Sequence, residues 1–331
     1  MKNACIVGYG AIGPVHADAI DQLEQCSLYA VCDINADRAK KCTDKYNCLY
    51  YSDFDTMLHD DNIDVVHVCT PHYLHKSMAM AALAAGKDVV LEKPVAMTRS
   101  KFEELEAFAD NIQNGKKVCV MLQNRTNACV VKMMDIFKND DSTGKLEGIL
   151  ANLAWHRDEE YYNQDPWRGN WKYEGGGLLI NQAVHLLDLM VYFGGDVSEV
   201  KSNISHWYIT NIEVEDNANA LIKFTSGING VFNATNCHST DAPFYLELQF
   251  ENMRLRYADG ALYKICDDDI QIIEHDKKAE VGKAYWGSGH QRVIDAFYSS
   301  LHGDDTVYAD IHDARNAMEL VYSMYEKGLS D

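Results

Sequence analysis

The glycine pattern near the amino terminus limits the possible folds more than any other feature of the sequence. The stretch "CIVGYGAIGPVHADAI" places Gly8, Gly10 and Gly13 in G-x-G-x-x-G spacing between an apolar run and a helical pattern. In that context Gly8 permits a tight turn, Gly10 lets the backbone approach a pyrophosphate, and Gly13 lets helix and strand pack closely. The helix N-terminus would offer N–H groups and a positive dipole end to the phosphates. We expect this loop, with Ala11 and Ile12, to bind a dinucleotide; a glycine-rich turn without a ligand is the alternative.

Short apolar runs alternate with helical patterns over the first part of the chain. The expected strands are 4–8, 28–33, 64–70, 88–94 and 118–123, and the expected helices are 12–25, 35–46, 72–85 and 100–114. This alternation predicts a parallel sheet, and the continuously apolar runs predict helices on both of its faces. Ser100 and Glu103 predict a capping box at the start of the last helix. The fold expected for residues 1–122 is a Rossmann domain with a doubly wound parallel sheet that binds NAD.

Longer strands with alternating apolar and polar residues follow. The expected strands include 217–225, 228–236 and 244–252, with turns at Ser226–Gly227 and Glu251–Asn252, and the expected helices are 128–138, 177–193, 290–302 and 311–327. Alternation of this kind predicts an antiparallel sheet with one covered face. For residues 123–331 we expect an α+β domain with a large, mainly antiparallel sheet.

Composition narrows the class of partner. The 331 residues carry a formal net charge of −20, which would repel the phosphate backbone of nucleic acids and anionic membrane surfaces. Ten cysteines without a C-x-x-C pair are expected to be buried free thiols. The first apolar run starts at residue 3, too early for a signal peptide, and no run reaches the roughly 18 residues of a membrane span. We expect a cytoplasmic protein with a small-molecule partner, and neither nucleic acid nor membrane as a partner.

Asp33 ends the second expected strand, twenty residues after Gly13. A carboxylate there can accept hydrogen bonds from both ribose hydroxyls of an adenosine and would repel a 2′-phosphate. NAD is therefore expected as the cofactor rather than NADP, with Ile34 beside it, although Arg38 could weaken this preference. As an alternative, Asp33 only caps the helix 35–46, a role that is compatible with the first.

Polar residues follow several expected strands, at the edge where a doubly wound sheet binds its ligands beyond the carboxyl ends of the strands. They are Thr70, Pro71, His72 and His75, then Glu92, Lys93 and Pro94, then Gln123, Asn124 and Arg125. We expect this set to gather around the cofactor.

Lys93 is the candidate base in this set. Partial desolvation beyond a buried strand and a positively charged nicotinamide nearby both disfavour the ammonium form, and a useful base needs a pKa about 2 to 3 units below the usual ~10.4. Pro94 cannot continue a ladder and is expected to end the strand at the lysine. A surface ion pair between Glu92 and Lys93 is the alternative, weakened because neighbours in a strand point to opposite faces.

A polar stripe marks the expected helix 177–193. Asn181, His185 and Asp188 lie at i, i+4 and i+7 on one face of an otherwise apolar helix. The preceding glycines, 175–177, would let the backbone approach a ligand closely. Three aligned polar groups favour a functional site over the alternative, a core histidine with a satisfied hydrogen bond.

These motifs together resemble the Gfo/Idh/MocA family, named after glucose–fructose oxidoreductase, inositol dehydrogenase and MocA. The resemblance covers nearly the whole chain and rests on an ordered set: Gly8 to Gly13, Asp33, "TPHYLH" at 70–75, "EKP" at 92–94, "QNR" at 123–125, "PWRG" at 166–169, "GGG" at 175–177, and Asn181 to His185. It implies that Lys93 is the catalytic base or part of a relay and that His185 assists proton transfer. It also implies a nicotinamide site lined by these residues: Thr70, Pro71, Glu92 and Lys93, to which we add His75 and Gln123.

Asn181 departs from the inositol dehydrogenase pattern, in which an aspartate lies four residues before the histidine. A neutral amide cannot raise the basicity of His185 as a carboxylate would, so a Lys–Asp–His triad is not carried over. Asparagine occurs here elsewhere in the family, and Asn181 stays a catalytic candidate. Asp188 could orient His185 from the next turn if it faces inward.

The resemblance implies oxidation of a secondary hydroxyl of a sugar, sugar derivative or cyclitol, or reduction of the ketone. A hydride acceptor and a base at the hydroxyl suffice for this chemistry, so no metal is expected. The expected substrate contacts are Lys93, Arg125, His156, Trp167, Arg168, Asn181 and His185. Two other functions stay open: a redox-neutral sugar-modifying enzyme that uses tightly bound NAD transiently, and a non-catalytic NAD-binding regulator. The exposed face of the second sheet is the usual oligomer surface of the family, which implies a homodimer or homotetramer.

Overall fold

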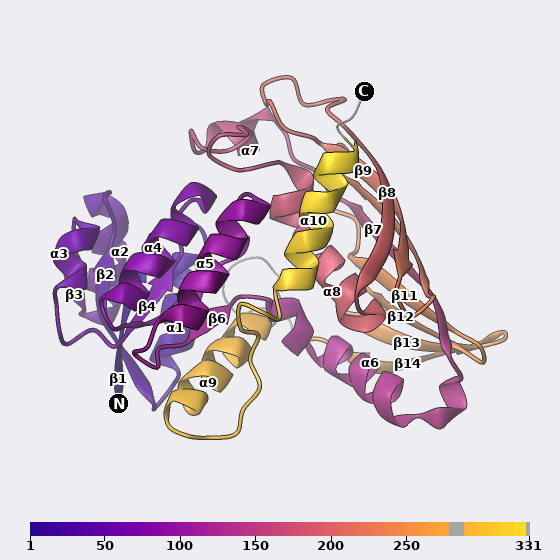
Figure 1. Ribbon diagram of the computed structural model, residues 1–331, viewed down its shortest axis with the longest axis horizontal. Helices are drawn as coiled ribbons and strands as arrows, with labels where there is room; N and C mark the ends of the chain where they lie inside the picture. Colours follow the sequence, from indigo (N-terminus) through magenta and orange to yellow (C-terminus); the bar gives the residue numbers. More distant parts are fainter. Residues whose placement is uncertain (278–287, 329–331) are drawn as a thin grey trace. The chain divides into compact units, whose positions relative to one another are not determined.

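The computed structural model describes residues 1–277 and 288–328, which divide into two compact units (Figure 1). The first unit contains Met1–Gln123 and, from later in the chain, residues 288–314. The second unit contains Asn124–Lys277 and residues 315–328. The boundary expected after residue 122 lies one residue before the point where the chain first leaves the first unit, after Gln123. The expectation that everything after it forms one domain does not hold for 288–314, which returns to the first unit.

The first unit is built on a parallel sheet with the strand order β3-β2-β1-β4-β5-β6. Its strands are β1 (Lys2–Val7), β2 (Cys26–Cys32), β3 (Leu49–Tyr51), β4 (Val65–Val68), β5 (Asp88–Leu91) and β6 (Val118–Val120). Every residue of β4 and β5 is buried, as expected when helices cover both faces of a sheet. The order reverses at β1, so the ligand crevice of such a fold lies at the carboxyl ends of β1 and β4.

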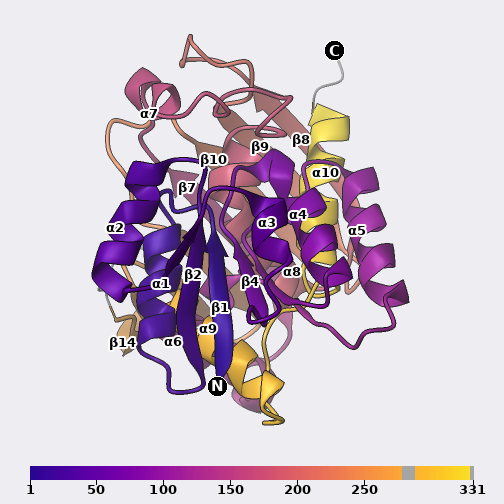
Figure 2. The same ribbon diagram turned by 90° about the vertical axis from the view of Figure 1, so that its left-hand side faces the viewer.

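Helices cover both faces of this sheet. They are α1 (Gly13–Asp21), α2 (Ala36–Tyr46), α3 (Phe54–Leu58), α4 (His72–Ala84), α5 (Arg99–Asn111) and α9 (Gly289–Leu301). In Figure 2 the strands run between α1 and α2 on one side and α4 and α5 on the other. The predicted Rossmann fold is confirmed. The sequence did not indicate β3 and α3, because elements of three and five residues are too short to show a period.

Helix α9 belongs to the first unit because its apolar face completes the core there. Val293, Ile294, Phe297 and Tyr298 share one cluster of buried residues with Ile20 of α1. Burial of this face supplies the main driving force for the return of the chain.

Helix α5 begins earlier than the sequence predicted. Thr98 is the N-cap: its backbone is extended, and its hydroxyl accepts a hydrogen bond from the N–H of Lys101 at 3.4 Å. Ser100 lies inside the first turn, and Lys101 rather than Glu103 is the third helical residue. The predicted capping box is therefore wrong. Serine and threonine are both good N-caps, and their spacing in the sequence could not choose between them.

The second unit is built on a sheet whose eight described strands follow the order β14-β13-β12-β11-β7-β10-β9-β8. They are β7 (Leu146–Ala154), β8 (Val197–Ser205), β9 (Asn217–Phe224), β10 (Asn229–Thr235), β11 (Tyr245–Phe250), β12 (Arg254–Ala258), β13 (Ala261–Cys266) and β14 (Asp269–His275). The sheet is antiparallel except for the parallel pair β7–β10, which confirms the prediction of a mainly antiparallel sheet. Both predicted turns join paired strands, β9–β10 and β11–β12.

Helices line one face of the second sheet (Figure 1). The helical segments are α6 (Ala128–Asn139), α7 (Glu159–Asn163), a π-helical turn (Leu179–Ala183), α8 (Val184–Gly194) and α10 (Arg315–Gly328). Residues of β9 alternate between buried and exposed positions, so the other face carries exposed side chains. No helix in the described ranges has the length and apolar character needed to cross a membrane.

Candidate active site

The three glycines of the loop between β1 and α1 have different functions in the structure. Gly8 has φ +90°, and a Cβ there would lie 2.7 Å from the carbonyl oxygen of Cys69. A Cβ on Gly13 would lie 2.7 Å from the carbonyl oxygen of Gly8. Gly8 and Gly13 are thus required by the fold itself. A Cβ on Gly10 would meet no described atom within 4 Å, so this glycine faces open space, where a ligand can approach the backbone.

The N-terminus of α1 follows this open space. Ile12 precedes the helix and gives no side-chain hydrogen bond to it, Pro14 lies in the first turn, and no acidic residue is present there. Pro14 has no N–H, and the N–H groups of Val15 and His16 bond to the carbonyl oxygen of Ile12. The helix start therefore offers a ligand the N–H of Gly13 and the positive end of the helix dipole, which favours phosphate. The loop geometry fits the pyrophosphate of a dinucleotide.

Asp33 joins the glycine loop to the start of α2. One carboxylate oxygen accepts a hydrogen bond from the N–H of Tyr9 and the other from the N–H of Asn35, both at 2.7 Å. The N-cap of α2 is Asn35, which accepts from the N–H groups of Asp37 and Arg38. The alternative in which Asp33 caps this helix is therefore wrong.

The surroundings of Asp33 leave room for an adenosine. Ile34, the next residue, is 96% exposed despite its apolar side chain. Arg38 lies in the first turn of α2 and is also exposed. An apolar side chain held in solvent beside a fixed carboxylate fits an aromatic base next to its ribose.

The segment after β4 is tied to the segment after β5 by His75, which is almost fully buried. Its Nδ1 lies 2.7 Å from the carbonyl oxygen of Pro94, and its Nε2 lies 2.8 Å from the carbonyl oxygen of Thr70. Burial lowers the pKa of His75, while the two carbonyls act in the opposite direction. The hydroxyl oxygen of Thr70 is buried without a hydrogen-bond partner in the described part of the chain, so it has capacity for a ligand.

Strand β5 ends at Leu91, so Glu92 and Lys93 follow the strand. The prediction that the strand runs to the lysine is wrong. Lys93 is half-buried, and its peptide bond to Pro94 is cis. Glu92 is buried and lies 3.0 Å from Nε2 of His16. Glu92 is therefore an interior acid that contacts His16, and not an exposed partner of Lys93 at the surface.

The polar stripe of the helix in the second unit is divided between two structures. Asn181 lies in the π-helical turn, a distortion that is frequent at functional sites, whereas His185 and Asp188 lie in α8. The carboxylate of Asp188 accepts hydrogen bonds from Nη2 of Arg125 at 2.6 Å and from its Nε at 3.0 Å. Arg125 also lies over the ring of Tyr192, 4.6 Å from its centre. Asp188 thus fixes Arg125, whereas the sequence analysis had considered it only as a residue that could orient His185.

Glu174 is an acid of this site that the sequence analysis missed. Its side chain is fully buried, and one carboxylate oxygen accepts a hydrogen bond from the Asn181 amide nitrogen at 2.5 Å. The other oxygen accepts from the N–H of Gly169 at 2.5 Å. Burial raises the pKa of Glu174 to about 7, although both hydrogen bonds act against this. Glu174 directly precedes the triple glycine, but an acid in a loop has no periodic signal.

The triple glycine makes room for the protein's own side chains. A Cβ on Gly176 would lie 2.0 Å from the hydroxyl of Tyr325, and one on Gly177 would lie 2.3 Å from the carbonyl oxygen of Glu215. The carboxylate of Glu215 accepts hydrogen bonds from the N–H groups of Gly177 and Leu179 and from the Tyr325 hydroxyl, at 2.8 to 2.9 Å. The space at Gly176 and Gly177 is occupied by Tyr325 and by the backbone of Glu215, where the sequence analysis expected a ligand.

The aromatic segment 154–171 forms two groups of contacts. Nη1 of Arg168 donates to the hydroxyl of Tyr161 at 2.6 Å, and its guanidinium lies over the ring of Trp167 at 4.7 Å. The exposed His156 instead places Nδ1 2.8 Å from the carbonyl oxygen of His238. These substrate candidates belong to the second unit with Asn181 and His185, whereas Lys93 and the cofactor candidates up to Gln123 belong to the first.

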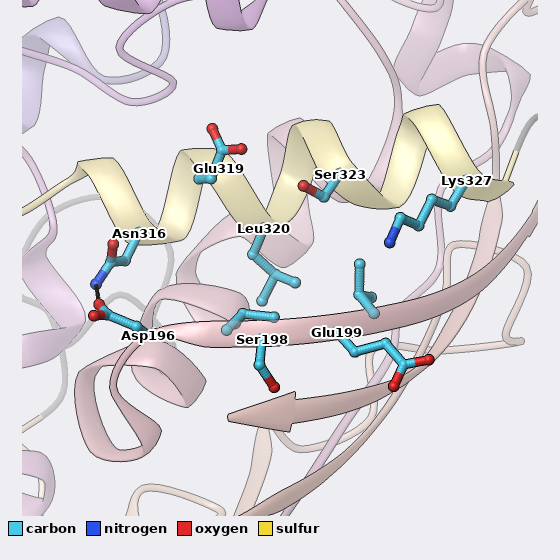
Figure 3. Close-up of a pocket in the computed structure, with 10 residues that line it drawn as sticks. Asp196, Ser198, Glu199, Asn316, Glu319, Leu320, Ser323 and Lys327 are labelled. Atoms are coloured by element: carbon cyan, nitrogen blue, oxygen red, sulfur yellow. Dashed lines mark hydrogen bonds between the residues drawn. The ribbon is translucent and has the colours of Figure 1, made fainter. Parts of the chain in front are cut away.

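A groove of about 180 Å³ lies between β8 and α10 (Figure 3). Asn316 donates to Asp196 at its rim at 2.8 Å, and Ser323 and Lys327 line it further along the helix. None of the site candidates lines this groove. Within the described residues no group of three or more His, Cys, Asp or Glu side chains is arranged to hold a metal ion.

Comparisons with known proteins bear on both units. A model of an oxidoreductase family with an NAD-binding Rossmann fold, GFO_IDH_MocA, matches residues 2–123, and a model of the GFO/IDH/MocA C-terminal domain matches residues 138–261. D-glucoside 3-dehydrogenase of Escherichia coli is 29% identical over 98% of this chain and 94% of its own length. Myo-inositol 2-dehydrogenase of Thermotoga maritima is 25% identical over 89% of this chain and 85% of its own length.

Two other curated relatives are matched over about half of their length, 54% and 53%. Among solved structures, the WlbA dehydrogenase from Bordetella pertussis, in complex with NADH and UDP-GlcNAcA, has 25% identity and a TM-score of 0.85. The similarity covers 99% of this chain and 97% of that one.

Proposed function

Because the chain belongs to the Gfo/Idh/MocA family of NAD-binding oxidoreductases, we propose that it transfers hydride between NAD and a secondary hydroxyl or ketone of a sugar, sugar derivative or cyclitol. The observation that carries the proposal is the gathering of Gly10, Asp33, Thr70 and Lys93 at the carboxyl edge of one parallel sheet. Relatives named for inositol and glucoside oxidation support the substrate class.

In this proposal the first unit binds the cofactor and supplies the base. NAD bound at the glycine loop would supply the hydride acceptor. Asp33 accepts hydrogen bonds from the ribose hydroxyls and disfavours a 2′-phosphate, which gives NAD its advantage over NADP. Lys93 takes the proton of the substrate hydroxyl, and His185 of the second unit assists the transfer.

Glu174 supports a catalytic function of Asn181 in the proposal. Because the amide nitrogen of Asn181 donates to Glu174, the group that the side chain offers on its other side is its carbonyl oxygen, a hydrogen-bond acceptor. Above about pH 7, where Glu174 is ionised, the negative charge that a carboxylate at position 181 would bring lies one side chain further away. Asn181 can therefore accept a hydrogen bond from a substrate hydroxyl while its orientation stays fixed.

The cluster of Tyr161, Trp167 and Arg168 supports carbohydrate binding. Aromatic rings give the flat apolar faces on which sugar rings stack, and a guanidinium held over such a ring donates to hydroxyl oxygens. His156 and Arg125 complete the proposed substrate contacts.

An NADH-absorbance screen of the purified protein tests the proposal, with NAD or NADP against inositols, free sugars, glycosides and nucleotide sugars. We expect net NADH formation with at least one class and faster turnover with NAD than with NADP. Tight NAD binding without net NADH formation would favour the redox-neutral alternative, and NAD binding without conversion of any substrate would favour a regulator. Absence of NAD binding would contradict the proposal as a whole.

A further inference from the structure

Four buried polar side chains form a hydrogen-bonded chain inside the first unit. Tyr298 of α9 places its hydroxyl 2.9 Å from Nε2 of His67 on β4. Nδ1 of His67 lies 2.9 Å from Nδ1 of His16 on α1, and Nε2 of His16 lies 3.0 Å from the carboxylate of Glu92. Three of the four side chains are fully buried, and Glu92 is 5% exposed. Polar groups in such surroundings persist only when they satisfy one another.

The proton positions in this chain follow from its ends. A carboxylate only accepts, so His16 must donate from Nε2 to Glu92. When both rings are neutral, His16 Nδ1 accepts from His67 Nδ1, and His67 Nε2 accepts from the Tyr298 hydroxyl. Burial lowers the pKa of His67 well below its usual value, in agreement with a neutral ring. If His16 instead carries an extra proton, its Nδ1 donates to His67 Nδ1, and His67 Nε2 donates to the Tyr298 oxygen. Glu92 accepts a hydrogen bond from His16 in both cases.

The chain ends on a carboxylate that stays ionised. Burial acts to raise the pKa of Glu92, but the hydrogen bond and charge of His16, followed by the charges of His290 and Lys93, bring it to about 2. His290 Nε2 lies 3.8 Å from the same oxygen that His16 contacts. The titratable groups that interact electrostatically with Glu92 are His16, His67, His75, His290, Lys93, Cys69 and Cys119.

We propose that Tyr298, His67 and His16 are positioning residues that hold the Glu92 carboxylate, with its negative charge, beside Lys93 and so control the protonation of Lys93. This inference rests on the proposed function, in which Lys93 is the base. An adjacent anion favours the ammonium form of a lysine, whereas an uncharged carboxyl group does not. The pH at which Lys93 becomes a base is then set by a chain that begins on α9, about two hundred residues later in the sequence.

The test follows Lys93 directly, by NMR of protein labelled with ¹³C at the lysine ε-carbons, with the Lys93 signal identified by its absence in Lys93→Arg. In His16→Leu the N–H to Glu92 is lost, burial dominates, and Glu92 takes up a proton at a higher pH. The ammonium form of Lys93 then loses a stabilising neighbour, and we expect its titration midpoint to fall by about one pH unit. His67→Val, which suits the valine-rich strand β4, should lower the midpoint less.

Two controls separate positioning from packing. His16→Gln keeps an N–H at the position of Nε2, so the Lys93 midpoint should stay at the value of the parent protein. Phe297→Leu removes buried volume next to Tyr298, so it should lower Tm and leave the Lys93 midpoint unchanged. Unchanged midpoints in His16→Leu and His67→Val, or equal shifts in all four variants, would overturn the inference. Because the NMR midpoint needs no turnover, a shift without any substrate being oxidised would leave this inference standing and refute the proposed function instead.

Discussion

At the scale of the residue, three buried acids lie next to groups that the proposed reaction uses, either in the sequence or by a hydrogen bond. Glu92 precedes Lys93, Asp33 joins the glycine loop to α2, and Glu174 holds the amide of Asn181. Each accepts hydrogen bonds from N–H groups, and these offset the cost of removing a carboxyl group from water. Charge at the site is therefore set from inside the protein, where salt and solvent screen it least.

Replacing Lys93 tests the assignment of the base. In Lys93→Ala we expect kcat to fall by about 10²- to 10⁴-fold, the usual contribution of a positioned base. NAD affinity should change by less than about tenfold, because hydrogen bonds at the glycine loop and Asp33 supply most of the binding. Stopped-flow NADH formation and NAD titration by protein fluorescence measure the two quantities. Lys101→Ala, on α5, should alter neither, and a loss of NAD binding equal to the loss of kcat would contradict the assignment.

Asp33→Asn tests the cofactor preference. The variant keeps the shape of the side chain and removes its charge, and a hydrogen bond to a charged group contributes about 1.5 to 3 kcal/mol. We expect NAD affinity to fall by roughly 10- to 100-fold, with NADP affinity unchanged or higher. Calorimetric titration with both nucleotides gives the ratio. Asp37→Asn, in the first turn of α2, is the matched control, and an unchanged ratio in Asp33→Asn would refute the ribose contact.

At the scale of the element, periodic signals decided what the sequence could predict. The helices α1, α2, α4, α5 and α9 and the strands β1, β2, β4, β5 and β6 were predictable because each has a continuous apolar run or a helical period. The position of the cofactor candidates directly after the strands was predictable too, because a parallel sheet collects its carboxyl ends at one edge. Glu215 was not, since its partners lie 36 to 110 positions away in the chain and leave no local pattern.

The glycine loop gives a prediction at the same scale. Gly8→Ala forces a side chain into a left-handed backbone and against the carbonyl of Cys69, so we expect the free energy of unfolding to fall by about 1 to 3 kcal/mol or more. Gly10→Ala meets no described atom and should leave Tm nearly unchanged while weakening NAD binding. Thermal unfolding and NAD titration compare the two. Gly86→Ala, with φ +72° and open surroundings, isolates the backbone effect; equal NAD affinity in Gly10→Ala and the parent would argue against a ligand at this loop.

At the scale of the whole molecule, two buried acids link stability to pH. Burial raises the pKa values of Glu174 and Glu215 to about 7, above the ordinary 4.5. Between these values the folded state holds protons that the unfolded chain has released, so their stabilising contribution is complete below about pH 4.5 and is lost as pH rises through about 7.

Glu215→Gln should therefore flatten the dependence of unfolding free energy on pH. We expect the difference from the parent protein to change between about pH 4.5 and pH 7, and to be most unfavourable to the variant at the acidic end, where the parent keeps its full contribution. Urea unfolding followed by fluorescence measures it, with Glu213→Gln, an exposed acid two residues away, as control. Parallel curves for Glu215→Gln and the parent would show that Glu215 does not titrate in this range.

The uncovered face of the second sheet gives a prediction about assembly. Leu150, Val231 and Leu221 lie side by side on three neighbouring strands and are exposed. We propose that this face pairs with that of a second copy, giving a homodimer or homotetramer. Light scattering at micromolar concentration should show a multiple of the chain mass, and Leu221→Lys should reduce it while Leu49→Lys, in the first unit, should not. A monomeric parent protein would refute the proposal.

The return of the chain to the first unit at α9 has a consequence for how the protein is made. A ribosome releases residues 1–123 long before it releases Phe297 and Tyr298, so the first unit stays without part of its core while the whole of 124–277 is synthesised. The same delay leaves His67 without its tyrosine, and the polar chain to Glu92 is completed only then. The second unit could not be replaced by recombination at one point after Gln123, because the replacement would also have to be followed by α9, which completes the core of the first unit.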